Sequence, residues 1–173
     1  MIKLRKAKIN ESVKILELYN NIIDTANDEF NPKWNNEYIN LGFIEDSILK
    51  EELYVYKVDE MIISSVVVNN DFGKRYTDAN WIVDAKPNEI VVIHTFAVNP
   101  SCRGKGISKE IFNIIKKQSL KNHKKTIRVD VINGNNGAEI VFKHLGFKHV
   151  DTVEEFYDAV GLETFHLYEY VLK

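Results

Sequence analysis

The chain has 173 residues, of which 45% are hydrophobic and 28% charged, and its formal net charge is −2 at pH 7. A chain of this length can bury a core without disulfide or metal support, and this mixture of residues excludes the disordered and collagen-like classes. The near balance of acids and bases gives no general attraction to nucleic acid or anionic lipid, and the single cysteine excludes an intrachain disulfide and a cysteine-rich zinc site.

The first half of the sequence predicts a strand, a helix and a hairpin. Residues 2–9 alternate loosely, as a strand does, and Asn10 followed by Glu11 is typical of a capped helix start. Apolar residues then recur at helical spacing. Residues 53–58 and 61–68 are rich in β-branched and aromatic side chains, and the two residues between them predict a tight turn, so we expect an antiparallel hairpin.

Aromatic residues recur at helical spacing before the hairpin, at Phe30, Trp34 and Tyr38. They fit one face of a helix packed on a core, and they also fit the wall of a substrate pocket. We favour the helix, because aromatic stripes usually belong to a core. Another short helix is expected over residues 44–51.

Strands and helices alternate in the second half. Residues 69–88 are polar and predict a loop anchored by Trp81 and Ile82, whereas residues 90–98 are apolar on both faces, as in a central buried strand. The other expected elements are a helix over 107–119, a strand over 126–132, a short helix over 138–145, and closing strands over 147–153 and 165–172. A hairpin followed by this alternation predicts a mixed α/β or α+β sheet.

The turn after the central strand carries the clearest chemical signal. Arg103-Gly-Lys-Gly106 separates that strand from an amphipathic helix that begins at Ile107. Glycines let backbone amides approach a ligand, and the first turn of a helix offers N–H groups and a positive partial charge, so the segment suits a pyrophosphate. A dinucleotide-binding turn needs a third glycine, and a nucleoside-triphosphate loop needs Ser or Thr at the position of Gly106, so both alternatives fit poorly.

Three segments together resemble the GNAT superfamily of acyl-CoA-dependent N-acetyltransferases. Arg103-Gly-Lys-Gly-Ile-Ser108 is similar to the Arg/Gln-x-x-Gly-x-Gly/Ala loop of that family, and Phe96-Ala-Val-Asn-Pro100 is similar to its strand end. Asn135-Asn-Gly-Ala-Glu-Ile-Val-Phe-Lys-His-Leu-Gly-Phe147 resembles its Asn-x-x-Ala…Gly-Phe helix. The resemblance is firmest over residues 53–150. It implies an α/β (α+β) fold with a mixed, mostly antiparallel, twisted sheet of six to seven strands flanked by about four helices.

The resemblance also implies acetyl-CoA as the co-substrate, without a metal. Residues of the strand end, the glycine turn and the later helix are then expected to bind the coenzyme: Phe96, Ala97, Val98, Arg103, Gly104, Lys105, Gly106, Ile107, Ser108, Asn135 and Phe142. In this assignment the turn holds the pyrophosphate, Asn135 positions the pantetheine, and a backbone N–H near Val98 faces the thioester oxygen. Phe142 stands where many members have a tyrosine that acts as general acid.

The catalytic proton acceptor is predicted to be His94, because it interrupts an otherwise apolar strand and histidine is the most frequent general base in enzymes. A buried neutral histidine bonded to the backbone fits the pattern equally well. Glu89 is the alternative base, acting through water, unless it only caps the strand. Since Phe142 has no hydroxyl, the proton donor is open. Tyr168 is our candidate, with Tyr157 and Tyr170 as alternatives, and each of the three could instead serve only in aromatic packing.

The predicted function is transfer of an acetyl group from acetyl-CoA to a primary amine of a small molecule, by direct attack in a ternary complex. The alternatives are an acyl-CoA-binding regulatory module without turnover and an enzyme that acetylates protein or peptide amines. We expect no nucleic-acid or membrane partner, and a homodimer is an open alternative. Residues 1–173 are expected to form one N-acetyltransferase domain in a soluble cytoplasmic protein, since no apolar run has the length of a membrane span.

The acceptor pocket is the least predictable part of the molecule. We expect it among residues 25–43, the loop over 69–88 and the last two strands. These segments carry no motif of the family, so the identity of the amine stays open.

Overall fold

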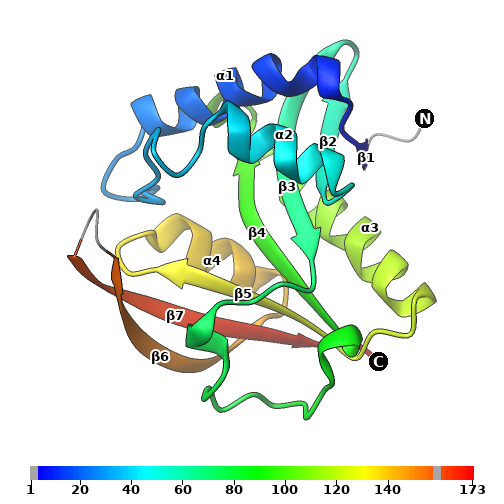
Figure 1. The fold of residues 1–173 in the computed structure, drawn as a ribbon, viewed down its shortest axis with the longest axis vertical. Helices are drawn as coiled ribbons and strands as arrows, with labels where there is room; N and C mark the ends of the chain where they lie inside the picture. The colour runs from blue at the N-terminus through cyan, green and yellow to red at the C-terminus, as the bar shows by residue number, and fades with distance from the viewer. Residues whose placement is uncertain (1–3, 158–160) are drawn as a thin grey trace. The chain divides into compact units, whose positions relative to one another are not determined.

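The computed structural model describes residues 4–157 and 161–173, apart from the side chain of Tyr157. Within these residues the chain forms one seven-stranded sheet, in the strand order β1-β2-β3-β4-β5-β7-β6, and four α-helices (Figure 1). The strands are β1 (Leu4–Lys6), β2 (Leu53–Val58), β3 (Met61–Asn69), β4 (Ile90–Val98), β5 (Thr126–Ile132), β6 (Lys148–Tyr157) and β7 (Gly161–Val171). The helices are α1 (Ser12–Asp24), α2 (Leu41–Leu49), α3 (Ile107–Lys121) and α4 (Asn136–His144).

Most strand pairs in the sheet are antiparallel. β1 pairs with β2, β2 with β3, and β7 with both β5 and β6 in this way. β4 and β5 run parallel and pair over Ile90–Val92 and Thr126–Arg128. This mixed, mostly antiparallel sheet confirms the predicted fold class, together with the predicted hairpin and the central strand over 90–98.

The chain divides into two compact units, and the division falls inside β4. The first unit consists of the described part of Met1–Ala26 together with Lys33–Val68 and Ile93–Ile114. The second consists of Asn27–Pro32, Asn69–Val92 and the described part of Ile115–Lys173. Each unit has its own cluster of buried apolar side chains. The expectation of one domain over residues 1–173 stays a prediction.

In the first unit, α1 and α2 pack on the β2–β3 hairpin. The helix residues that face the hairpin recur three or four positions apart, and Leu53 and Val55 alternate along β2, so each element turns one apolar face inward. The buried cluster consists of Ala7, Ile15, Leu18, Tyr19, Ile22, Ile39, Ile44, Ile48, Leu53, Val55, Val67 and Ala97. Ala97 belongs to this cluster, so the end of β4 packs on this core shortly before the turn over residues 103–108.

In the second unit, the long loop between β3 and β4 packs on β5 and β7. Three of its aromatic rings pack one against the next, with ring centroids 6.0 Å apart for the stacked pair Phe72 and Tyr76 and 5.1 Å apart for the tilted pair Tyr76 and Trp81. The buried cluster there consists of Tyr76, Ile90, Val92, Phe165 and Leu167. The predicted loop is confirmed, and it forms a packed layer on the sheet.

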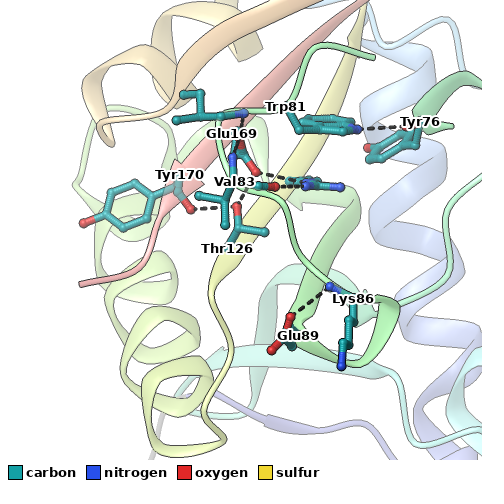
Figure 2. Close-up of polar contacts among 10 residues, drawn as sticks. Tyr76, Trp81, Val83, Lys86, Glu89, Thr126, Glu169 and Tyr170 are labelled. Carbon is teal, nitrogen blue, oxygen red and sulfur yellow. Dashed lines mark hydrogen bonds and ion pairs between the residues drawn. The ribbon is translucent and has the colours of Figure 1, made fainter. Parts of the chain in front are cut away.

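A buried ion pair fastens this loop to the strands (Figure 2). The Arg128 guanidinium on β5 and the Glu169 carboxylate on β7 lie 3.0 Å apart, and only 4% and 0% of these side chains are exposed. Glu169 also accepts the backbone N–H of Ile82 at 2.5 Å. Arg128 donates to the carbonyl of Val83 at 2.9 Å and lies 4.1 Å from the ring centroid of Trp81. Trp81 therefore anchors the loop as predicted. The side chain of Ile82 is 53% exposed and only its backbone N–H is held, so the prediction is wrong for that side chain.

A second charged contact holds the same loop. Arg75 donates to Asp130 on β5 at 2.5 Å and to Glu155 on β6 at 2.6 Å, and its guanidinium lies 3.8 Å from the ring centroid of Phe165. The hydroxyl of Tyr76 donates to Asp130 at 2.7 Å. Burial, together with the Asp130 carboxylate, raises the pKa of Tyr76 well above its ordinary value, so this hydroxyl keeps its proton.

The helix predicted over the aromatic segment before α2 is wrong, because residues 25–40 form no α-helix. Asn27 Oδ1 accepts the backbone N–H groups two and three residues further along the chain, at 2.9 and 3.0 Å. Asn35 Oδ1 does the same at 3.1 and 2.9 Å. Such side-chain acceptors compete with the helical hydrogen bonds of the backbone. Trp34 and Phe30 consequently do not share a helix face. Trp34 packs on the buried cluster of the first unit, and Phe30 belongs to the second unit.

The first helix begins slightly later than predicted. Asn10 lies inside a single 3-10 turn over Ile9–Glu11, and α1 starts at Ser12. In place of an Asn10 cap, the Glu11 carboxylate accepts the backbone N–H of Lys8 at 3.0 Å. The predicted first strand is present as β1, and residues 2–3 of that prediction lie outside the described residues.

Candidate active site

The turn that joins β4 to α3 lies entirely in the first unit. Asn99 Oδ1 accepts the N–H of Ser101 at 3.0 Å, and a 3-10 turn follows over Pro100–Cys102. Gly104 and Gly106 then adopt left-handed φ angles of 74° and 76°, which glycine takes without a steric penalty. Among the described atoms outside the adjoining residues, none lies within 4 Å of where a Cβ would stand on either glycine. The space beside both residues is therefore open.

Helix α3 begins directly after the second of these glycines. The carbonyl of Gly106 accepts the N–H of Glu110 at 3.1 Å, which closes the first helical turn. The N–H groups of Ile107, Ser108 and Lys109 come before that bond, so helix geometry gives them no acceptor within α3. Their alignment adds a positive partial charge that favours an anion.

The end of β4 presents successive backbone groups to its two edges. Toward β3, the carbonyl of Ala97 accepts the hydroxyl of Ser64 at 2.5 Å, and the N–H of Asn99 donates to the carbonyl of Ile63 at 2.8 Å. Neighbouring backbone groups in a strand point to opposite edges, so the N–H of Val98 points away from β3. The predicted role of Val98 requires a backbone donor on that edge.

His94 and Phe96 are half-buried on β4, in the first unit. The residue between them, Thr95, has a φ of 46° although it is β-branched. A left-handed residue inside a strand interrupts the regular alternation of the backbone. The sequence does not signal this feature, because a threonine in an apolar strand is ordinary and only the surrounding structure sets its φ.

Glu89, the alternative base, lies in the second unit in a single 3-10 turn that leads into β4. Its carboxylate accepts the backbone N–H of Lys86 at 2.9 Å (Figure 2) and pairs with Lys125 at 2.9 Å. The backbone hydrogen bond, followed by the contact with Lys125, lowers the pKa of Glu89. A carboxylate with a lowered pKa is a weaker proton acceptor. These contacts at the start of β4 are the ones expected if Glu89 only caps the strand.

Helix α4, also in the second unit, carries the two remaining coenzyme-binding predictions. Asn135 precedes the helix, and its carbonyl accepts the N–H of Glu139 at 3.2 Å. The side chain of Phe142 is 6% exposed and packs edge-on against Phe147, with ring centroids 5.3 Å apart. Phe142 thus fills a core position and has no proton to donate.

Tyr168 on β7 donates its hydroxyl to Glu139 at 2.6 Å. Burial and this contact raise the pKa of Tyr168 well above its ordinary value, so the phenol stays protonated near neutral pH. Glu139 also pairs with Lys143 at 3.1 Å. Of the alternative donors, Tyr170 packs on Phe147, and the side chain of Tyr157 lies outside the described residues.

The segment Asn27–Pro32 meets the first turn of α4 within the second unit. The N–H of Gly137 donates to the carbonyl of Glu29 at 2.7 Å. A Cβ at position 137 would stand only 2.1 Å from Cε1 of Phe30, so the aromatic ring occupies the space that any other side chain needs. The glycine is therefore required for the contact between this segment and the helix.

We expect Gly137→Ala to destabilise the protein by about 1–3 kcal/mol, the usual range for overpacking a core. The new methyl group must displace the Phe30 ring. Denaturant unfolding measures the loss, and the double variant Gly137→Ala/Phe30→Ala should regain part of it. Gly73→Ala is the matched control, because the space beside that glycine is open. Unchanged stability of Gly137→Ala would contradict this packing.

The predicted site residues divide between the two units. The first contains His94, Phe96, Ala97, Val98 and the turn from Arg103 to Ser108, and the second contains Glu89, Asn135, Phe142 and Tyr168. Within the first unit, the predicted base, the predicted backbone donor and the glycine turn follow one another along β4 into α3. Their proposed roles stay predictions.

Comparison with known sequences defines the class of protein. The sequence profile of the Acetyltransferase (GNAT) family matches residues 17–147, which is well over half of the chain. The chain therefore belongs to the GNAT family, which groups it with the acyltransferases that use acetyl-CoA. A curated relative, an uncharacterised N-acetyltransferase of Methanocaldococcus jannaschii, is 31% identical over 77 residues. That match covers 44% of this chain and 34% of the relative, so it spans about a third of the relative's length.

Solved structures share the fold. The ribosomal-protein-alanine N-acetyltransferase of Brucella melitensis has a TM-score of 0.72 at 12% identity, over 98% of this chain and 99% of its own. An N-acetyltransferase of Staphylococcus aureus Mu50 has a TM-score of 0.68 at 17% identity, over 98% of each chain. The yncA protein of Salmonella typhimurium, solved with acetyl-CoA, has a TM-score of 0.71 at 14% identity, over 98% of this chain and 93% of its own.

No helix among the described residues is both long and apolar enough to cross a membrane. In the same part of the chain, no three His, Cys, Asp or Glu side chains are grouped so that they could hold a metal ion.

Proposed function

We propose that the protein transfers the acetyl group of acetyl-CoA to a primary amine of a small molecule, by direct attack within a ternary complex. The observation that supports the proposal best is the turn from Arg103 to Ser108. It combines two left-handed glycines, open space beside both, and the N-terminus of α3. Backbone N–H groups and a helix dipole arranged in this way favour a diphosphate, which is the anionic group of coenzyme A.

The charged side chains of the turn fit the same ligand. Arg103 is half-buried and Lys105 is exposed, and both lie next to the left-handed glycines. A guanidinium donates paired hydrogen bonds to phosphate oxygens, and an ammonium adds a mobile positive charge. The turn therefore has the donors and the charge that a diphosphate requires.

The chemistry requires a proton acceptor and a backbone donor. An ammonium must first lose a proton, and in our proposal His94 accepts it. The nitrogen lone pair then attacks the thioester carbonyl carbon, the C–N bond forms and the C–S bond breaks. The nitrogen gives up a second proton to water as the departing thiolate takes one from water, so the products are the amide and free coenzyme A. The Val98 N–H donates to the carbonyl oxygen as negative charge develops there.

One observation favours the second candidate function, a module that binds acyl-CoA without turnover. Phe142 occupies the position at which many family members have an acid, and its ring is buried against Phe147. A thiol ionises near pH 8.5, so a thiolate can leave without a strong acid, and the missing hydroxyl is compatible with turnover.

Incubation of the purified protein with acetyl-CoA and a panel of amines tests the proposal. Release of free thiol shows turnover, and mass detection of the acetylated product identifies the acceptor class. We expect thiol release that depends on a small amine. Coenzyme binding without thiol release across the panel would support the regulatory module, and acetylation of peptides alone would support a protein acceptor.

Replacement of His94 by alanine separates the base from coenzyme binding. We expect His94→Ala to lower kcat by about 100-fold or more, which is typical of the loss of a general base. The dissociation constant for acetyl-CoA should stay the same, because the glycine turn is unchanged. His123→Ala, a histidine in an exposed position after α3, is the matched control. Wild-type turnover in His94→Ala would remove His94 from the mechanism.

A further inference from the structure

Thr95, on β4 between His94 and Phe96, has a backbone conformation that threonine rarely adopts. Its φ is 46°, in the left-handed region, and its side chain is 8% exposed. A β-branched residue in this region costs about 1–3 kcal/mol and persists only where the surrounding structure holds it. Some contact must therefore stabilise this residue.

The hydroxyl of Tyr19 supplies that contact within the first unit. Tyr19 lies on α1 and is 0% exposed. Its hydroxyl donates to the carbonyl oxygen of Thr95 at 2.9 Å, and it lies 3.2 Å from the Thr95 hydroxyl oxygen and 3.3 Å from that of Ser65 on β3. Two of these three oxygens belong to the left-handed residue itself. Burial raises the pKa of Tyr19, so the donor keeps its proton.

The backbone on both sides of Thr95 carries the proposed chemistry. His94 precedes it, and the Val98 N–H follows three residues later. In a strand, the backbone N–H and C=O of one residue point to one edge, and those of the next residue point to the other edge. A left-handed residue breaks this alternation and so changes which backbone groups face which edge. The conformation of Thr95 therefore decides where the Val98 N–H points relative to His94.

We propose that Tyr19 is a positioning residue for acetyl transfer: its buried hydroxyl holds Thr95 in the left-handed conformation, and this fixes His94 and the Val98 N–H in their working orientation. The inference rests on the proposed function. The ring of Tyr19 also packs edge-on against Trp34, with centroids 5.5 Å apart. Trp34 belongs to the segment before α2, which we expect near the acceptor, so the same tyrosine contacts that segment and β4.

Tyr19→Phe removes the hydroxyl and keeps the ring. We expect kcat to fall on the order of 10- to 100-fold, because small displacements of reacting groups have effects of this size. The KM for acetyl-CoA should rise by a smaller factor than kcat falls, since the turn over residues 103–108 is separate from the contact. Tyr56→Phe is the matched control, because Tyr56 is also buried in the first unit, at 2% exposure. Its kcat should equal that of the wild type.

A second substitution distinguishes positioning from general packing. Glycine adopts a φ of 46° without strain, so Thr95→Gly removes the need for the contact. In the double variant Tyr19→Phe/Thr95→Gly, kcat should recover at least threefold relative to Tyr19→Phe. An equal or lower kcat in the double variant, or wild-type kcat in Tyr19→Phe, would overturn the proposal.

Amide hydrogen exchange keeps this test separate from the proposed function. In the protein without substrate, Tyr19→Phe should increase the exchange rate of the amides of residues 94–98 at least tenfold, and Tyr56→Phe should not. If no amine is acetylated but this increase occurs, the proposed function fails and the contact stands. If exchange over residues 94–98 is the same in all three proteins, the contact does not hold Thr95 and the inference is wrong.

Discussion

Replacing Gly106 with glutamate is expected to abolish acetyl-CoA binding, with a loss of affinity of more than about 100-fold. Gly106 has a φ of 76°, and a side chain in this region costs about 1–2 kcal/mol, or roughly a factor of ten in binding if the turn must move. The new carboxylate would also extend into the open space beside the turn and repel the diphosphate. Isothermal titration calorimetry measures the dissociation constant directly.

Two further variants separate backbone strain from charge. Gly106→Ala has the strain without the charge and should bind acetyl-CoA about tenfold more weakly than the wild type. Gly73→Glu makes the same charge change at a glycine with a φ of −72° in the loop between β3 and β4, and its affinity should not change. Unchanged affinity in Gly106→Glu would show that the coenzyme does not use this turn.

Glu169→Leu is expected to be the most destabilising of the substitutions considered, with a loss of about 3–5 kcal/mol. It leaves the buried guanidinium of Arg128 without its carboxylate. It also removes the acceptor for the N–H of Ile82 and for the hydroxyl of Thr126, which donates to Glu169 at 2.7 Å. For a protein of this size, such a loss lowers Tm by roughly 10 °C, which differential scanning calorimetry detects.

Removing both charges tests whether the ion pair itself causes the effect. In Arg128→Met/Glu169→Leu no charge is left unpaired, so the double variant should be more stable than Glu169→Leu alone. Glu51→Gln is the control for an exposed pair, since Lys6 and Glu51 are 2.9 Å apart with 48% and 72% of their side chains exposed. Its Tm should not change measurably. A Tm of Glu169→Leu equal to that of the wild type would contradict the role assigned to the buried pair.

Strands rich in β-branched residues could be predicted to the residue. The bounds of β4 and β5 agree with the predicted strands over 90–98 and 126–132, because most residues in each are β-branched and Asn99-Pro100 ends the first. The segment before α2 could not be predicted in this way. Its aromatic spacing favours a helix, but the side chains of Asn27 and Asn35 accept the backbone hydrogen bonds that a helix would use.

The candidate site was predictable where chemistry depends on local sequence. Glycine at positions 104 and 106 predicts a turn with backbone angles that other residues avoid. In the structure both glycines adopt left-handed φ angles. The contact between Tyr19 and Thr95 joins residues 76 positions apart. No local pattern signals it, because the φ of Thr95 depends on a hydroxyl supplied by a distant helix. The same holds for Glu169, whose burial depends on a loop more than 80 residues earlier in the chain.

A crystal structure with bound coenzyme A is the most direct test of the account. We predict that the diphosphate oxygens lie within about 2.7–3.2 Å of backbone N–H groups in the turn over residues 103–108. A coenzyme bound elsewhere while this turn makes no contact with it would contradict the account, and so would a turn whose amides all face the protein interior.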